Sequence, residues 1–233
     1  MYRLPVLTDI QNELIDKLKL LSSGITNTST QYKQLAKKHW DAIAKPLDSL
    51  GEFERIFQKL SAIFESEIPV IDKKCITVMC SDNGVVEEGI SQSGKEVTLA
   101  VAKSMALGTS SISVLCRSCA SDLMVIDMGI DSFDSDIYSM GVINHKLMHG
   151  TNNFVKEKAM PPDISLRAIL TGIEIVENLK SKGINIIGTG EMGIGNTTTS
   201  SALSSALLNL PVANVTGRGA GLNDIKLQRK IDI

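Results

Sequence analysis

Short apolar runs alternate with helical periods through the last two thirds of the chain. Three of these runs have the length of a strand and lie at residues 75–80, 123–130 and 184–187. A fourth run, residues 212–216, follows a helical stretch of small and apolar residues. Helical segments separate the strand-like runs, and this alternation is typical of a parallel sheet covered by helices. The pattern therefore predicts an α/β fold with a mainly parallel, Rossmann-like sheet.

The opening third of the chain shows helical periods and no strand-like run. Apolar residues recur on one face of three segments, residues 8–21, 32–44 and 52–64. We therefore expect residues 1–70 to form a small helical unit and residues 71–233 to form the α/β core.

A glycine-rich turn lies between the third strand-like run and the helical stretch after it. Residues 184–200 read INIIGTGEMGIGNTTTS, so the turn has few side chains that could obstruct a ligand. Glycines let backbone N–H groups approach an anion, and the N-terminus of the following helix adds unpaired donors and a partial positive charge. The stretch therefore predicts a cradle for a phosphate group.

Three kinds of nucleotide site have such a turn, and two of them fit this sequence poorly. A Walker-type loop needs a lysine where Asn196 stands. The dinucleotide fingerprint of an NAD-dependent oxidoreductase is matched by Gly188, Gly190 and Gly193, but the acidic residue expected about twenty residues later is missing. A phosphomonoester or ribose-phosphate site remains, in which Glu191 accepts hydrogen bonds from ribose hydroxyls or faces a cationic ring. A glycine-rich helix cap without a ligand is the structural alternative.

Polar residues directly follow two other strand-like runs. Ser81, Asp82 and Asn83 come after the first run, with Glu88 a few residues later, and a second glycine turn at residues 217–221 comes after the fourth. Open α/β sheets bind ligands at the carboxyl ends of their strands, so we expect these segments to converge with the first glycine turn on one cleft. Asp-Asn-Gly sequences also favour plain turns, and that interpretation stays open for the first segment.

Composition narrows the classes of function. The 233 residues have a net charge of -2, which gives no reason to expect a nucleic acid or an acidic membrane surface as partner. We see no membrane span, signal peptide or transit peptide in the pattern, so a cytoplasmic protein is expected. The four cysteines lie in apolar stretches and are expected as reduced thiols. No cofactor and no metal site are predicted, since the pair His145 and His149 lacks a third ligand.

Five motifs occur in order along the chain. They are KPLDSLG at residues 45–51, SDNGVVEEGIS at 81–91, GTNNF at 150–154 with AMP at 159–161, GEMGIGNTT at 190–198 and GRGAGL at 217–222. From about residue 31 onward, the chain resembles the nicotinate-nucleotide:dimethylbenzimidazole phosphoribosyltransferase family of cobamide biosynthesis. Five spaced motifs are far more specific than a single glycine-rich turn.

The resemblance implies transfer of 5-phosphoribose from nicotinate mononucleotide to a lower-ligand base in cobalamin biosynthesis, which gives an α-riboside 5′-phosphate and nicotinate. It also implies a homodimer. The family's motifs assign two sets of roles to this chain. The phosphate and ribose would be held by Glu191, Gly193, Gly195, Asn196, Thr197, Thr198, Gly217 and Arg218, and the base would be bordered by Ser81, Asp82, Asn83 and Glu88.

The chain departs from the family pattern at points that concern the base and the catalysis. Asn83 stands where the family has His, Leu47-Asp48 where it has Pro-Gly, and residues 91–95 replace its SAYP-like continuation. The incoming base therefore stays open between a benzimidazole-like base, a purine and a phenol. The family's general-base glutamate lies beyond Ile233, so no catalytic residue is assigned and the chain is expected to be the front part of a longer protein. The alternative is a binding module that holds a nucleotide monophosphate without turnover of its own.

Overall fold

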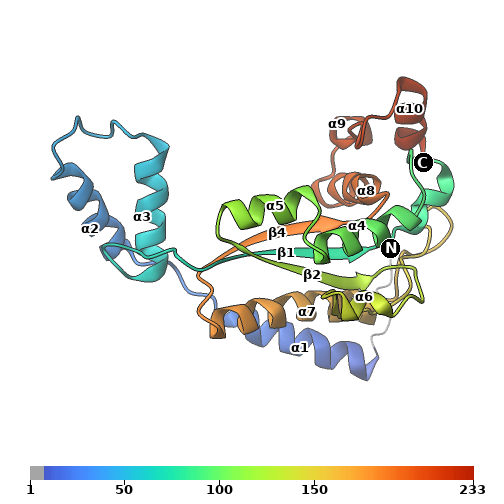
Figure 1. Cartoon of the computed structure of the whole chain (residues 1–233), viewed down its shortest axis with the longest axis horizontal. Coiled ribbons are helices and arrows are strands. Elements are labelled where there is room, and N and C mark those ends of the chain that lie inside the picture. Colours follow the sequence, from blue (N-terminus) through green and yellow to red (C-terminus); the bar gives the residue numbers. More distant parts are fainter. Residues whose placement is uncertain (1–7) are drawn as a thin grey trace. The chain divides into compact units, whose positions relative to one another are not determined.

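The computed structural model describes residues 8–233, so residues 1–7, where the expected helical unit begins, lie outside it. In the described part, four strands form one parallel sheet in the order β3-β2-β1-β4. Figure 1 shows β2, β1 and β4 side by side in this order. The strands are β1 (Lys74–Ser81), β2 (Asp122–Gly129), β3 (Ile143–Asn144) and β4 (Ile186–Met192). The predicted α/β fold with a parallel sheet is confirmed.

Helices connect and flank the strands. In chain order they are α1 (Asp9–Ser23), α2 (Thr30–Asp41), α3 (Glu52–Phe64), the 3₁₀ helix η1 (Gly84–Glu88), α4 (Glu96–Ala106), α5 (Ser111–Ser118), α6 (Asp136–Ser139), α7 (Pro162–Ser181), α8 (Asn196–Leu208), α9 (Val212–Val215) and α10 (Asp224–Asp232). The first three helices coincide with the three helical periods of the opening third of the sequence.

The chain divides into two compact units. One unit consists of Asp16–Asp72, and the other consists of Lys73–Ile233 together with residues 8–15 of the described chain. The start of α1 thus belongs to the unit that contains the sheet, and the second boundary lies at residue 72, beside the division expected at residue 70.

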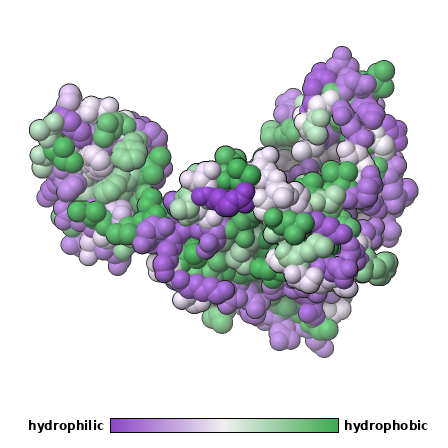
Figure 2. Space-filling model, viewed as in Figure 1, coloured by the Kyte–Doolittle hydropathy of each residue, from purple (hydrophilic) through white to green (hydrophobic). Residues whose placement is uncertain are grey.

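The smaller unit is held together by contact between α2 and α3. Trp40 meets Phe53 and Phe57 edge to face, with ring centroids 5.8 and 5.3 Å apart. The carboxylate of Glu54 is buried and lies 2.7 Å from the ammonium group of Lys45. Many apolar side chains of this unit are exposed, and Figure 2 shows hydrophobic surface on it.

The sheet has a hydrophobic core on each of its two faces. Successive side chains of a strand point to opposite faces. Val78 of β1 packs with Ala102 and Met105 of α4, whereas Cys75 of β1 packs with Ile175 of α7. Both faces are covered, as a parallel sheet requires, and the ends of the strands form an edge where a ligand can bind.

Two of the predicted strands differ from the structure. The strand predicted at residues 212–216 is wrong, because this run forms the short helix α9 after Pro211 and pairs with no strand of the described sheet. The third predicted strand begins later and extends further than expected. Gly188 and Gly190 belong to β4 because the whole strand is paired with β1.

One segment, Glu96–Ser118, is long and apolar enough to cross a membrane by length and composition. It forms two helices, α4 and α5, which are separated at Gly108, where φ is +78°. Because α4 contacts β1, β2 and β4, packing on the sheet accounts for its apolar residues.

The ladder between β1 and β2 is irregular at its carboxyl end. Cys80 pairs with Asp127, but Ser81 pairs with Gly129, so Met128 is an extra residue on β2. This bulge lies at the edge of the sheet where the polar segment after β1 begins.

Candidate functional site

The loop predicted to hold a phosphate leaves the sheet at the carboxyl end of β4. It is shorter than the sequence indicates, because only residues 193–195 connect β4 to α8. A Cβ atom on Gly193 would lie 2.0 Å from the carbonyl oxygen of Ser81, and Gly195 has a φ of +89°. Both positions therefore need glycine, which lets the loop lie directly on the end of β1. We call residues 193–195 the phosphate loop.

The N-terminus of α8, which begins at Asn196 and has 13 residues, points its N–H groups and the positive end of its dipole toward the phosphate loop. In the described structure these N–H groups donate to the carbonyl oxygens of Gly193 and Gly195 and to the side chain of Asn196, so an anion would have to replace these partners. The hydroxyl oxygen of Thr198 is buried and has no hydrogen-bond partner among residues 8–233. An unpaired buried hydroxyl is costly, which makes Thr198 a candidate for binding a ligand.

A lysine that the sequence analysis did not single out lies beside this helix end. Lys230 of α10 is 3% exposed, and its Nζ donates to Oγ1 of Thr197 at 2.8 Å and to the carbonyl oxygen of Gly217 at 3.0 Å. Burial lowers the pKa of Lys230, and within the described residues it forms no ion pair with a carboxylate. A buried cation without an anionic partner is suited to bind an anion.

A small cavity of about 70 Å³ lies between the start of α8 and the second glycine turn. Its lining consists of Ile90, Ser91, Gln92, Ile194, Gly195, Asn196, Thr197, Thr198, Arg218, Gly219, Ala220 and Leu222. Arg218 reaches this cavity, although its guanidinium group pairs with Asp224 at 2.6 Å and donates to the carbonyl oxygen of Leu222 at 2.9 Å. The structure thus brings the two glycine turns together around one cavity.

Asn83 contacts the phosphate loop. Its side-chain nitrogen donates to the carbonyl oxygen of Ile194 at 3.2 Å, and its side-chain oxygen accepts from the hydroxyl of Thr199 at 2.9 Å. The segment after β1 therefore reaches the phosphate side of the site through Asn83, a contact between residues 111 positions apart in the sequence.

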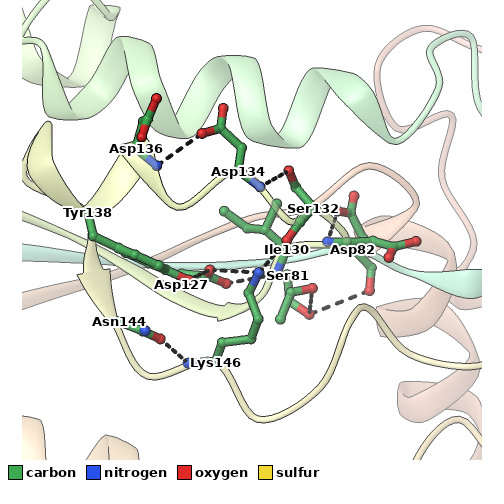
Figure 3. Close-up of polar contacts among 12 residues, drawn as sticks. Ser81, Asp82, Asp127, Ile130, Ser132, Asp134, Asp136, Tyr138, Asn144 and Lys146 are labelled. Carbon is green, nitrogen blue, oxygen red and sulfur yellow. Dashed lines mark hydrogen bonds and ion pairs between the residues drawn. The ribbon is translucent and has the colours of Figure 1, made fainter.

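Asp82 is buried behind the strand ends. Its Oδ2 accepts from the backbone N–H of Asp131 at 2.8 Å, and burial raises the pKa of its carboxyl group. Figure 3 shows Asp82 together with a second buried carboxylate, Asp127, which accepts from the hydroxyl of Tyr138 at 2.9 Å and lies 3.4 Å from Nζ of Lys146. Burial and the hydrogen bond to Asp127 raise the pKa of Tyr138 to about 12. The two carboxylates hold the loop that follows β2.

The two glutamates of the predicted site have different surroundings. Glu88 accepts from the side-chain amide of Asn153 at 2.7 Å and pairs with Arg229 at 3.2 Å, so it connects the GTNNF loop to α10. Glu191 is exposed at the end of β4 and accepts from the side-chain amide of Asn196. Its carboxylate is therefore available at the rim of the phosphate loop. Within residues 8–233, no group of three or more His, Cys, Asp or Glu side chains is placed to hold a metal ion.

A larger cavity, of about 440 Å³, opens at the carboxyl ends of β1 and β2 beside α7. Its lining consists of Met79, Ser81, Met128, Leu147, Met148, Thr151, Met160, Ile164, Ala168, Ile169 and Gly172. No charged side chain contributes to this lining, and its polar side chains are the hydroxyls of Ser81 and Thr151. Such a cavity suits a flat, mainly apolar ligand, and we call it the apolar cavity.

Comparison with known proteins gives one consistent result. A phosphoribosyltransferase family model matches residues 25–233. The chain is 45% identical over 217 residues to the nicotinate-nucleotide–dimethylbenzimidazole phosphoribosyltransferase of Acetivibrio thermocellus, which covers 92% of this chain and 61% of that protein. It is 44% identical over 211 residues to the protein of the same name from Ruminiclostridium cellulolyticum, with 91% and 59% covered.

A solved structure agrees with these relatives. The crystal structure of CobT from Thermus thermophilus is similar with a TM-score of 0.82 and 32% sequence identity, which covers 86% of this chain and 60% of that one. The chain thus spans about 60% of the length of the curated relatives that it matches.

Proposed function

Because the chain belongs to the phosphoribosyltransferase family of the nicotinate-nucleotide–dimethylbenzimidazole enzymes, we propose that it transfers 5-phosphoribose from nicotinate mononucleotide to a lower-ligand base. The base is 5,6-dimethylbenzimidazole or a related compound, and the products are an α-riboside 5′-phosphate and nicotinate. The observation that carries this proposal is the buried, carboxylate-free Lys230 beside the unpaired hydroxyl of Thr198 at the start of α8.

The 5′-phosphate of the donor occupies the small cavity in this proposal. The hydroxyl of Thr198 donates to its oxygens, and backbone N–H groups at the start of α8 exchange their present partners for it. Lys230 lines a neighbouring cavity and supplies positive charge from behind Thr197. The absence of side chains at Gly193 and Gly195 lets the loop pack against Ser81, Asn83 and Val86, which places the start of α8 beside the cavity. The remaining residues of the cradle are Asn196, Thr197, Gly217 and Arg218.

Nicotinate mononucleotide is an activated donor, because its cationic ring is a good leaving group. A nitrogen of the base attacks C1′ of the ribose with its lone pair, the bond from C1′ to the ring nitrogen breaks, and the bonding electrons neutralise the ring. Holding the donor by its phosphate and ribose makes this step effectively intramolecular. Glu191, at the rim of the phosphate loop, accepts hydrogen bonds from the ribose hydroxyls.

A benzimidazole attacks through its unprotonated ring nitrogen, and the N–H proton of its second nitrogen must then pass to an acceptor. Asp82 is 1% exposed, and Glu88 is paired with Arg229. Neither carboxylate is therefore placed to take this proton in the arrangement described, and both act by holding the loops around the site.

The incoming base occupies the apolar cavity in this proposal. The hydroxyls of Ser81 and Thr151 are the polar side chains that line the cavity, so a purine would leave more of its ring nitrogens and amino groups without partners than a benzimidazole or a phenol. We therefore favour a benzimidazole-like or phenolic base over a purine.

A homodimer in the cytoplasm completes the proposal. The smaller unit exposes large apolar side chains, among them Phe53 and Ile63, as an interface between subunits requires. All four cysteines are free thiols, which agrees with a reducing compartment.

Replacing Gly195 by aspartate tests the phosphate assignment. In Gly195→Asp the new side chain meets Asn83, Val85 and Val86 beneath the phosphate loop, at a backbone φ of +89°, so it displaces the loop and we expect no measurable binding of nicotinate mononucleotide or inorganic phosphate in calorimetry. Gly141→Asp is the matched control, because Gly141 also has a positive φ, of +108°, and lies at an open surface turn. We expect the control to bind like the unchanged protein, and equal binding by Gly195→Asp would refute the assignment.

Two further measurements complete this experiment. Glu191→Gln removes the charge at similar shape, so we expect weaker binding of nicotinate mononucleotide at an unchanged affinity for inorganic phosphate. Detection of the α-riboside 5′-phosphate after incubation with nicotinate mononucleotide and 5,6-dimethylbenzimidazole distinguishes turnover from binding alone.

A further inference from the structure

The peptide groups on either side of Ile194, in the middle of the phosphate loop, are held by two buried side chains. The N–H of Ile194 donates to Oγ1 of Thr98 at 3.1 Å, and its carbonyl oxygen accepts from the side-chain nitrogen of Asn83 at 3.2 Å. Thr98 lies in the first turn of α4 and is 0% exposed, and Asn83 directly precedes η1. Neither residue lines the small cavity. We call these two contacts the Ile194 clamp.

Each side chain of the clamp has a second partner that orients it. The side-chain oxygen of Asn83 accepts from the hydroxyl of Thr199 at 2.9 Å, so Asn83 connects the phosphate loop to the first turns of α8. The hydroxyl of Thr98 lies close enough to the buried carboxyl of Asp82 to affect its pKa. Burial raises the pKa of Asp82, while the N–H of Asp131 and the hydroxyl of Thr98 lower it.

The phosphate loop needs such support because of its own composition. Ile194 lies between Gly193 and Gly195, and glycine loses more conformational freedom on ordering than any other residue. A loop that becomes ordered only when an anion binds would lose that freedom at the moment of binding, which weakens affinity. Hydrogen bonds from α4 and from the buried segment between β1 and η1 fix the loop before the anion arrives.

We propose that Asn83 and Thr98 are positioning residues, which set the direction of the N–H groups at the start of α8 by clamping Ile194. The proposal rests on the proposed function in so far as the anion is the phosphate of the donor. It assigns Asn83 to the phosphate side of the site, although the resemblance to the family implied a place beside the base.

A threonine series tests the clamp. Thr98→Val removes the hydroxyl at nearly constant shape, and we expect about tenfold weaker binding of inorganic phosphate and of nicotinate mononucleotide in calorimetry. Thr98→Ser keeps the hydroxyl and should bind within about twofold of the unchanged protein. Thr77→Val is the matched control, because Thr77 is also buried but its hydroxyl donates to Gly188 in the sheet, at 3.4 Å. We expect no change of phosphate affinity in this control.

Asn83→Leu gives a second, independent measurement, which stands even if Thr98→Val does not fold. We expect a similar loss of phosphate affinity. The double variant should lose less than the product of the two single losses, because both side chains act on one residue. A role in stability alone would lower the melting temperature of Thr98→Val and Thr77→Val alike and leave phosphate affinity unchanged in both.

The outcomes separate this proposal from the proposed function. Unchanged phosphate affinity in folded Thr98→Val and Asn83→Leu would overturn the clamp. If the wild-type protein binds inorganic phosphate but not nicotinate mononucleotide, the proposed function is contradicted. A loss of phosphate affinity in both variants would still support the clamp in that case. An unchanged protein that binds no phosphate would overturn both.

Discussion

At the scale of single residues, Lys230 connects ligand binding to protonation. Its ammonium group is buried between Thr197 and Gly217 and donates hydrogen bonds to two neutral oxygens. Neutral oxygens compensate less of the lost hydration than a carboxylate would, which is why burial lowers the pKa of this lysine. A bound phosphate would supply the missing negative charge and favour the protonated form.

Phosphate affinity should therefore depend on pH through Lys230. Above about pH 8 a phosphate monoester stays doubly charged, so a decrease of affinity with rising pH reports loss of the lysine proton below its ordinary pKa of 10.5. We expect calorimetry between about pH 8 and 10 to show this decrease. Lys230→Met should bind phosphate weakly and without pH dependence over the same range. An affinity that stays constant in the unchanged protein would contradict this role.

In the protein without ligand, the lowered pKa of Lys230 makes stability increase with pH, whereas phosphate affinity decreases with pH. The folded state releases the proton of Lys230 at a lower pH than the unfolded state, so the unfolded state binds more protons between the two pKa values. The contribution of Lys230 to the free energy of unfolding should therefore rise with pH and become constant above about pH 10.5. Lys230→Met should lack that contribution.

At the scale of elements, the strands that the sequence predicts are those buried on both faces. β1 and β2 read as continuous apolar runs because helices cover both sides of the sheet. β4 does not, because Gly188 and Gly190 resemble a turn and become strand only through the ladder to β1. Residues 212–216 are apolar and look like a strand, but no strand pairs with them in the described part of the chain. The sequence does not show which segments pair.

In the candidate site, too, some features follow from neighbouring residues in the sequence, and others depend on how distant segments pack together. The need for glycine at position 195 follows from its positive φ, which is local turn chemistry and predictable, whereas the need at position 193 comes from the close approach to Ser81. The role of Lys230 depends on how α10 packs, and its one sequence signal is its position three residues after Leu227, on the inner face of that helix. The contact of Asn83 with Ile194 has no signal in a single sequence.

The first turn of α10 should therefore affect phosphate binding. Asn223 is the N-cap of α10, and its side-chain oxygen accepts from the N–H of Lys226 at 2.9 Å. We expect Asn223→Ala to lower the free energy of unfolding by about 1 kcal/mol and to weaken phosphate binding, because α10 positions Lys230. Denaturant titration and calorimetry measure the two effects.

Ser29→Ala is the control for this experiment. Ser29 caps α2 in the smaller unit, where its hydroxyl accepts from the N–H of Tyr32. Its loss should lower stability in the same way without changing phosphate affinity. Equal phosphate affinity in Asn223→Ala and Ser29→Ala would show that the cap of α10 does not position Lys230.

At the scale of the whole molecule, the end of β1 serves two cavities of different character. Ser81 lines the apolar cavity, whereas Asn83, two residues later, holds the phosphate loop beside the small cavity. One edge of the sheet thus has a polar cavity for the charged phosphate group and an apolar cavity for the aromatic ring of the base. The proposed reaction requires this arrangement, because its two substrates meet at the ribose.

Filling the apolar cavity should affect one substrate alone. Ala168 of α7 lines this cavity, and Ala168→Phe should raise the KM for 5,6-dimethylbenzimidazole at least about tenfold while calorimetry shows unchanged binding of nicotinate mononucleotide. Ala100→Phe, on the exposed side of α4, is the matched control and should change neither value. An unaltered KM for the base in Ala168→Phe would place the base elsewhere.

The bulge between β1 and β2 limits how this edge of the sheet can evolve. Met128 is the extra residue of the bulge and also lines the apolar cavity. Deleting Met128 would restore a regular ladder, but it would turn Gly129 and the side chains after it to the opposite face. The character of the apolar cavity can therefore be changed by exchanging its side chains at constant strand length, whereas a change of length at this edge would disturb the loop that follows β2.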